Sequence, residues 1–137
     1  MIYITRRERF SAAHKLAKGD WSEERNLEVF GKCANPNWHG HNYELFVTVK
    51  GEVNKETGFL IDLRVLKEII LNNVVEKLDH MNINLDVDFM KNKMASTEIL
   101  AMEIFNILAP KIKAEGAELH AIKLYETENN SVEYFGN

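Results

Sequence analysis

Two stretches with the alternating pattern of β-strands precede two stretches with helical spacing, and two more alternating stretches follow, an order that few folds accommodate. The alternating stretches are residues 1–13, 41–50, 118–126 and 131–135. Strands on both sides of a helix pair predict an α+β fold, with an antiparallel four-stranded sheet and two helices packed on one face. Such a sheet has two free edges, so we expect copies of the chain to assemble edge to edge.

Capping residues indicate where the helices begin. Asp62 can cap a helix that runs to about Leu78, and Ser96 can cap one that ends near Pro110. A shorter helix over residues 22–30, with a serine as its N-cap, is inserted after the first strand. The side chains expected to face the sheet are Leu63, Leu66, Ile70, Val74 and Leu78 from the first long helix, and Leu100, Ile104, Ile107 and Leu108 from the second.

The composition indicates a single globular domain over residues 1–137. A net charge of −4 disfavours nucleic-acid binding but is compatible with an anionic small molecule, which a few local cations can bind. No apolar run is long enough for a membrane helix, and the first residues lack a secretory-signal pattern. Cys33 is the only cysteine, which excludes an internal disulfide and any zinc site that needs two thiolates. We therefore expect a cytoplasmic protein with no membrane partner.

Two of the five histidines form the motif His39-Gly40-His41, at the start of the second predicted strand. Residues i and i+2 of a strand point to the same side, so both imidazoles can bind one ion. A catalytic zinc typically has three protein ligands and an open position, and His14 is the best third candidate, because the first two strands are expected to form a hairpin. Zinc is preferred because redox-silent sites made of imidazoles alone suit it. The alternative is that the pair are ordinary surface or core histidines.

Three further residues have side chains suited to proton transfer. Cys33 lies in a loop six residues before His39, where a thiolate near a divalent cation can act as a base or nucleophile. Asp79 and His80 close the first long helix, and a carboxylate that accepts from one imidazole nitrogen raises the basicity of the other. The alternatives are a small buried hydrophobe for the cysteine, and a helix C-terminus that suits a protonated histidine.

Carboxylates at two element ends are candidate ligand-binding groups. Glu126 ends the third strand, where it is either solvated or paired with a planar fork of N–H groups on a ligand. Thr97 and Glu98 lie in the first turn of the second long helix, where their default role is to stabilise the helix start. His120, within a strand, is expected to be structural.

Taken in order, these segments resemble the 6-pyruvoyl-tetrahydropterin synthase family over almost the whole chain. The resemblance implies the tunnelling fold, in which three subunits close into a barrel and two trimers stack into a homohexamer. The segments that carry it are Phe10–His14 (FSAAH), Asn26–Cys33 (NLEVFGKC), Asn35–Tyr43 (NPNWHGHNY), Gly58–Asp62 (GFLID), Leu78–Asn82 (LDHMN), Ser96–Glu98 (STE) and Tyr125–Asn130 (YETENN).

The resemblance also implies a chemistry. The family converts 7,8-dihydroneopterin triphosphate to 6-pyruvoyl-tetrahydropterin with loss of triphosphate, a carbon–oxygen lyase reaction without an external redox cofactor. By position in the motifs, His14, His39 and His41 match the Zn²⁺ ligands, Cys33 the catalytic base, Asp79 and His80 the proton-relay pair, Glu126 the pterin anchor, and Thr97 and Glu98 a segment that lines the pterin pocket.

Two other functions stay open on the sequence. A sister branch of the family makes 6-carboxy-tetrahydropterin for queuosine-type deazapurine synthesis, and typically has three residues between the cysteine and the HxH pair. Here five residues, Ala34–Trp38, separate them, as in the pyruvoyl branch. The remaining alternative is a zinc-dependent pterin-binding protein without catalysis, which would have no need of Cys33, Asp79 and His80.

Overall fold

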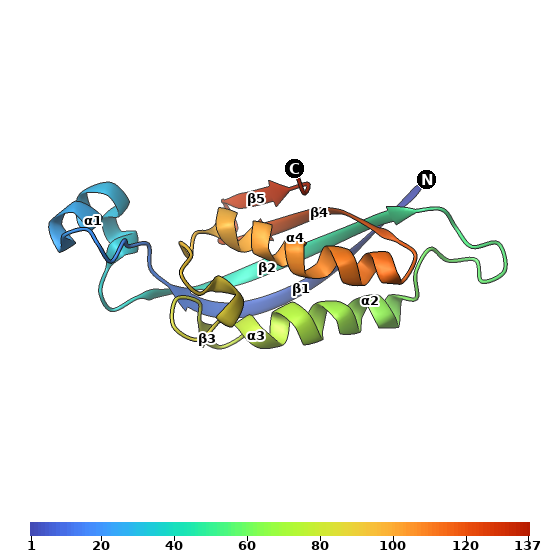
Figure 1. The fold of residues 1–137 in the computed structure, drawn as a ribbon, viewed down its shortest axis with the longest axis horizontal. Helices are drawn as coiled ribbons and strands as arrows, with labels where there is room; N and C mark the ends of the chain where they lie inside the picture. Colours follow the sequence, from blue (N-terminus) through green and yellow to red (C-terminus); the bar gives the residue numbers. More distant parts are fainter.

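A computed structural model describes all residues, 1–137. One sheet forms the central part of the molecule, with strand order β3-β1-β2-β4-β5 (Figure 1). The pairs β1–β2, β2–β4 and β4–β5 are antiparallel, which confirms the predicted four-stranded arrangement. The strands are β1 (Ile2–His14), β2 (His39–Gly51), β3 (Met81–Asn82), β4 (Glu118–Tyr125) and β5 (Ser131–Tyr134).

The helices begin where the capping residues predict. Ser22, Asp62 and Ser96 each accept a hydrogen bond from a backbone N–H in the first turn of the helix that follows. A π-helical turn at Leu71–Val75 joins α2 to α3 without a break in direction (Figure 1). The helices are α1 (Glu23–Phe30), α2 (Leu63–Ile70), α3 (Glu76–Leu78) and α4 (Thr97–Ala114), and short 3-10 turns span Gly31–Ala34 and Asp88–Met90.

The core lies between one face of the sheet and the helices α2, α3 and α4 (Figure 1). Alternate residues of β1 and β2 are buried on this face, as the strand pattern predicts. The other face is polar; Arg7 there pairs with Glu44 at 2.9 Å. The buried side chains that form the centre of the core are Tyr43, Leu45, Val47, Leu66, Ile70, Leu78, Leu100, Ile104, Leu108, Ile112, Ile122 and Leu124.

The sheet has one more strand than predicted. Met81 and Asn82 form β3, which runs parallel to β1. Two backbone hydrogen bonds hold the segment there, from the N–H of His80 to the Ser11 carbonyl at 2.6 Å and from the N–H of Ile83 to the Ala13 carbonyl at 2.8 Å. A strand of two residues is too short to show alternation in a sequence, so only the tertiary pairing reveals it.

Two details of the helix predictions are wrong. Leu63, placed on the apolar stripe, is 57% exposed, because helical spacing gives the direction of a side chain but not whether a neighbour covers it. The second long helix does not end near Pro110 but continues to Ala114. Its last turns stay helical because Leu108 and Ile112 are fully buried against the core, which offsets the hydrogen bond lost at the proline.

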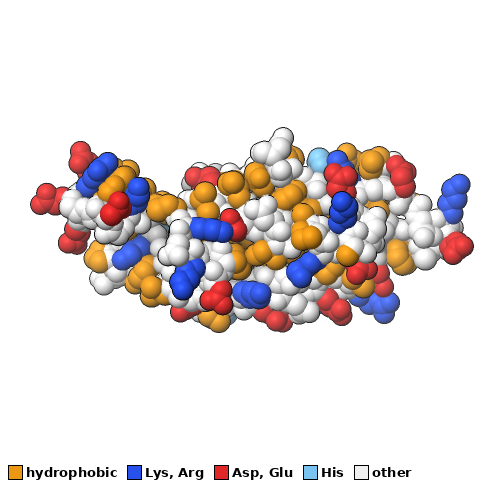
Figure 2. All heavy atoms as spheres, viewed as in Figure 1, with side chains coloured by type: hydrophobic (Ala, Val, Ile, Leu, Met, Phe, Trp, Pro, Cys, Tyr) orange, Lys and Arg blue, Asp and Glu red, His pale blue; other side chains and the backbone are white.

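The face of the molecule that the helices cover has no large patch of charges of one sign. Figure 2 shows acidic and basic side chains mixed over this face, including the end that carries α1. None of the helices has the length and apolar character needed to cross a membrane.

Candidate functional site

Three imidazoles converge at one end of the sheet, as the sequence predicts. In the β1–β2 ladder His14 lies opposite His39, and His41 lies opposite Ala12. The ring centroids are 4.5–5.0 Å apart, and each histidine offers one ligand atom within 4.8 Å of the other two. This convergence depends only on strand parity and on the antiparallel register, both of which are local properties of the hairpin.

The chemistry of the cluster fits a metal ion. His14 Nε2, His39 Nδ1 and His41 Nε2 are buried and have no hydrogen-bond partner. Burying such atoms unpaired is costly, whereas a cation that shares their lone pairs would remove the cost. The other nitrogen of His14, Nδ1, lies 2.6 Å from the carbonyl of Ala95 and can donate to it, which would fix the tautomer and leave Nε2 free to coordinate. Three imidazoles and an open position are a typical donor set for catalytic zinc.

Burial also keeps the three imidazoles in the neutral form that a metal needs. Desolvation is the first cause that lowers the pKa of His14, His39 and His41 below the ordinary value. Glu126 raises the three pKa values but does not outweigh desolvation. Neutral imidazoles are the ligand form, so the fold prepares the cluster for binding before an ion arrives.

These lowered pKa values predict an acid-sensitive fold for the metal-free protein. The unfolded chain binds protons at the three histidines near pH 6.5, whereas the folded chain binds them only at lower pH. The stability contribution is therefore intact above pH 6.5 and is lost as the pH falls through the folded-state values. We expect the urea midpoint of the metal-free protein to fall between pH 7 and pH 5. A His14→Gln variant should show a smaller fall, and an equal fall in both proteins would contradict the assignment.

Glu126 and Thr97 lie beside the cluster. The hydroxyl of buried Thr97, at the first residue of α4, donates to Glu126 Oε2. Glu126 Oε1 is 3.6 Å from His41 Nε2, and Glu126 Oε2 is 4.0 Å from His14 Nε2. Thr97 thus orients a carboxylate beside the cluster, with one oxygen left free of the hydroxyl. Glu98 is exposed and makes no hydrogen bond or ion pair with these residues, so its proposed role stays a prediction.

Asp79 and His80 form a bonded pair, which their adjacency alone could not establish. Asp79 Oδ2 is 3.0 Å from His80 Nδ1, and Asp79 Oδ1 accepts the backbone N–H of Ser11 at 2.9 Å. The Ser11 hydrogen bond is the first cause that lowers the pKa of Asp79 below its ordinary value. The imidazole of His80 is largely exposed on a residue with φ 63°, so it is oriented by its carboxylate and accessible to a ligand.

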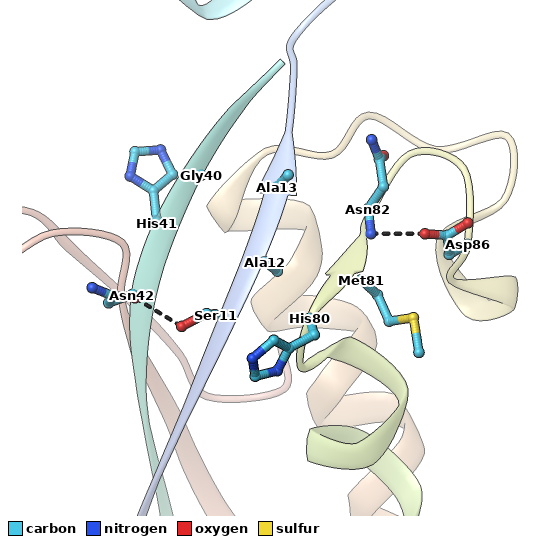
Figure 3. Close-up of a pocket in the computed structure, with 10 residues that line it drawn as sticks. All are labelled: Ser11, Ala12, Ala13, Gly40, His41, Asn42, His80, Met81, Asn82 and Asp86. Carbon is cyan, nitrogen blue, oxygen red and sulfur yellow. Dashed lines mark hydrogen bonds between the residues drawn. The ribbon is translucent and has the colours of Figure 1, made fainter. Parts of the chain in front are cut away.

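His80 and one member of the cluster border the same hollow. An open pocket of about 500 Å³ is lined by His41 from β2 and by His80 from the segment before β3, with β1 between them (Figure 3). Ser11 and Asn42, joined by a 2.8 Å hydrogen bond, also line it. Of the three clustered histidines only His41 lines this pocket, and it shares the pocket with His80.

Cys33 lies on the 3-10 turn that follows α1. Its carbonyl accepts the backbone N–H of Leu16 at 2.7 Å, which fixes the turn next to the chain that leaves β1 two residues after His14. The thiol is half-buried, it is not among the three metal-ligand candidates, and it does not line the pocket of Figure 3. Its role as a base stays a prediction.

Two residues at the site had no signal in the sequence analysis. Trp38, directly before His39, has φ 67°, a left-handed backbone that costs a bulky residue about 1–3 kcal/mol. Its N–H donates to the Asn35 carbonyl at 3.1 Å, which closes a tight turn. The ammonium of Lys15 lies 4.2 Å from the centre of a Trp38 ring. Neither the backbone angle nor this contact could be read from the order of residues.

Comparisons with known proteins bear on the family of the chain. A model of the 6-pyruvoyl tetrahydropterin synthase family matches residues 3–137. The chain belongs to this family. It is 42% identical over 133 residues to the Homo sapiens 6-pyruvoyl tetrahydrobiopterin synthase, which covers 97% of this chain and 90% of the relative.

A solved structure and a bacterial relative extend the comparison. The structure of Caenorhabditis elegans 6-pyruvoyl tetrahydropterin synthase superposes with a TM-score of 0.91 at 35% identity, over 99% of this chain and 96% of that one. The Bacillus subtilis 6-carboxy-5,6,7,8-tetrahydropterin synthase is 32% identical over 99 residues, 70% of this chain and 58% of the relative. The family's fold is thus the fold of this chain, and the similarity to the pyruvoyl enzymes covers more of it.

Proposed function

We propose that this chain is a 6-pyruvoyl-tetrahydropterin synthase, a zinc-dependent lyase that releases triphosphate from 7,8-dihydroneopterin triphosphate and rearranges the remainder to 6-pyruvoyl-tetrahydropterin. The observation that carries the proposal is the cluster of three buried, unpartnered imidazole nitrogens beside an oriented carboxylate at Glu126. His14, His39 and His41 would hold the ion. When bound, zinc supplies a Lewis acid that makes the hydroxyl-bearing carbons of the substrate easier to deprotonate.

The residues around the cluster have separate tasks in this proposal. Glu126, oriented by Thr97, accepts from the amino and ring N–H groups of the pterin and fixes its register. Cys33 takes a proton from carbon, and His80 returns protons with its ring held by Asp79. Because the protons and electrons move within the substrate, these side chains suffice without a redox cofactor.

Glu126→Gln should weaken substrate binding far more than it slows the bound complex. A charge-assisted pair of hydrogen bonds contributes about 1.5–3 kcal/mol, so we expect KM to rise roughly 10–100-fold. The measurement is steady-state kinetics with 7,8-dihydroneopterin triphosphate, with the metal content determined in parallel. Glu128→Gln, two residues along in an exposed turn, is the matched control and should leave KM unchanged. Equal values of KM for both variants would remove Glu126 as the anchor.

The product decides between this function and its alternatives. The zinc-loaded protein is incubated with 7,8-dihydroneopterin triphosphate, and the products are identified by mass spectrometry and phosphorus NMR. We expect free triphosphate and the pyruvoyl product. A 6-carboxy product with a two-carbon aldehyde would instead indicate the queuosine-type branch. Tight pterin binding with no turnover would indicate a binding protein.

The proposal includes a homohexamer made of two trimers. β1 is paired on its outer edge only at Ala12 and Ala13, where β3 lies, so the rest of that edge is open. β5 leaves a second open edge at the other side of the sheet. Two open edges allow the sheets of neighbouring subunits to join into a barrel. We place the enzyme in the cytoplasm, where the thiol of Cys33 would stay reduced.

A further inference from the structure

Lys15 is held in place from two sides at the end of β1. The side-chain amide of Asn84 makes two hydrogen bonds to the backbone of Lys15. It accepts from the Lys15 N–H at 3.0 Å and donates to the Lys15 carbonyl at 3.1 Å. Its ammonium lies over the ring of Trp38 at 4.2 Å. No carboxylate lies within 4.0 Å of it. The cation is therefore positioned by neutral groups, and its charge stays available to a ligand.

The conformation of Trp38 needs a reason. Glycine adopts the left-handed backbone at φ 67° without cost, and the turn closed by the Asn35 carbonyl requires only a backbone N–H. What the tryptophan adds is its indole, which lies under the ammonium of Lys15. A strained residue at the edge of a site points to a functional role for its side chain.

The groups of the site occupy successive places along β2 and just beyond its end. Glu126 lies beside His41, His39 comes two residues earlier on β2, and Trp38 with Lys15 forms the next pair beyond the ends of the two strands. At about 3.3 Å per residue, His39 lies roughly 7 Å from His41 along β2, and Trp38 is the next residue beyond His39. The proposed substrate has the same order, with the pterin ring first, then the hydroxyl-bearing carbons, and the triphosphate at the far end.

We infer that Lys15 binds the triphosphate of the substrate and that Trp38 is a positioning residue that holds the Lys15 ammonium there. This inference rests on the proposed function, because that function supplies the polyphosphate. It adds to the proposed function a side chain whose positive charge would contact the triphosphate. It also gives a reason for the strained backbone of Trp38, which directly precedes the metal-ligand candidate His39.

Binding of inorganic triphosphate tests the inference without turnover. The probe is titrated calorimetrically into the zinc-loaded protein of residues 1–137 and its variants, with zinc content measured in each. Lys15→Gln should raise the dissociation constant about tenfold or more, the effect of one lost charge-assisted contact, and Lys15→Arg should stay near the parent. Trp38→Gly should raise it about threefold or more with no loss of thermal stability, because glycine relieves the backbone strain. Trp38→Phe should recover most of the affinity, since a ring is restored.

The control is Lys55→Gln, which removes the same charge from the exposed loop that joins β2 to α2, at the opposite end of the molecule from α1 (Figure 1). Its affinity should equal that of the parent. An equal loss in Lys15→Gln and Lys55→Gln, or no loss in Lys15→Gln, would overturn the inference. If Lys15→Gln loses zinc, Trp38→Gly decides, and an unchanged dissociation constant there overturns it.

Kinetics separates this inference from the proposed function. If the parent converts 7,8-dihydroneopterin triphosphate and Lys15→Gln keeps its KM, the function stands and the subsite fails. If the parent binds inorganic triphosphate through Lys15 but makes no pyruvoyl product, the subsite stands and the function fails. With both correct, Lys15→Gln and Trp38→Gly raise KM more than they lower kcat.

Discussion

His39→Ala abolishes stoichiometric metal binding and, with it, turnover. The substitution removes one of three imidazoles whose unpartnered nitrogens converge, and leaves the His14–Ala95 contact intact. Losing even an outer-shell partner costs about 10–100-fold in metal affinity, so losing a ligand should cost at least the upper value. Zinc at 100 times the dissociation constant adds about 2.7 kcal/mol to the unfolding free energy of the parent. With an affinity 100-fold weaker, the same zinc adds only about 0.4 kcal/mol.

The measurement combines metal analysis of the purified protein with thermal unfolding in zinc and in chelator. His120→Ala is the matched control, because His120 is also a half-buried strand histidine but lies against Tyr3 and Phe135, outside the cluster. The control should keep one zinc per chain and the full zinc-dependent rise in Tm. One zinc per chain in His39→Ala, or an equal loss in both variants, would rule out the proposed metal site.

The elements that could be predicted depend on residues close together in the sequence. Caps at Asp62 and Ser96 and the alternation of β1 and β2 are of this kind. The end of α4 is not of this kind, because a proline ends a helix only where the residues after it are not packed against the rest of the protein. Burial of Ile112, worth about 1.5–3 kcal/mol, depends on a sheet that the local pattern does not contain.

The candidate site divides in the same way. The convergence of His14 with the HxH pair follows from strand parity and one hairpin, so the sequence was sufficient. The carbonyl of Ala95 that orients His14 comes from 81 positions away, and a backbone group carries no side-chain signal. The left-handed conformation of Trp38 was also invisible, because tryptophan is a residue that such a position disfavours.

Cys33→Ala should reduce turnover by about 10²–10⁴-fold, the range for loss of a positioned general base, while leaving zinc content at the parental value. The thiol is not among the metal-ligand candidates, so the two effects should separate cleanly. Its turn is fixed by a backbone contact, from the Leu16 N–H to the Cys33 carbonyl, which alanine preserves. The turn should therefore keep its position in the variant, so a loss of activity would reflect the loss of the thiol.

Single-turnover kinetics with 7,8-dihydroneopterin triphosphate, after metal analysis, measures this effect on the proton-transfer step. Cys33→Ser tests the chemistry at nearly constant volume, because a hydroxyl is a far weaker acid than a thiol and its anion is scarce near neutral pH. The turnover rate of Cys33→Ser should therefore remain close to that of Cys33→Ala. Parental turnover in Cys33→Ala would remove the thiol from the mechanism and leave the His80–Asp79 pair as the remaining proton-transfer group that the structure orients.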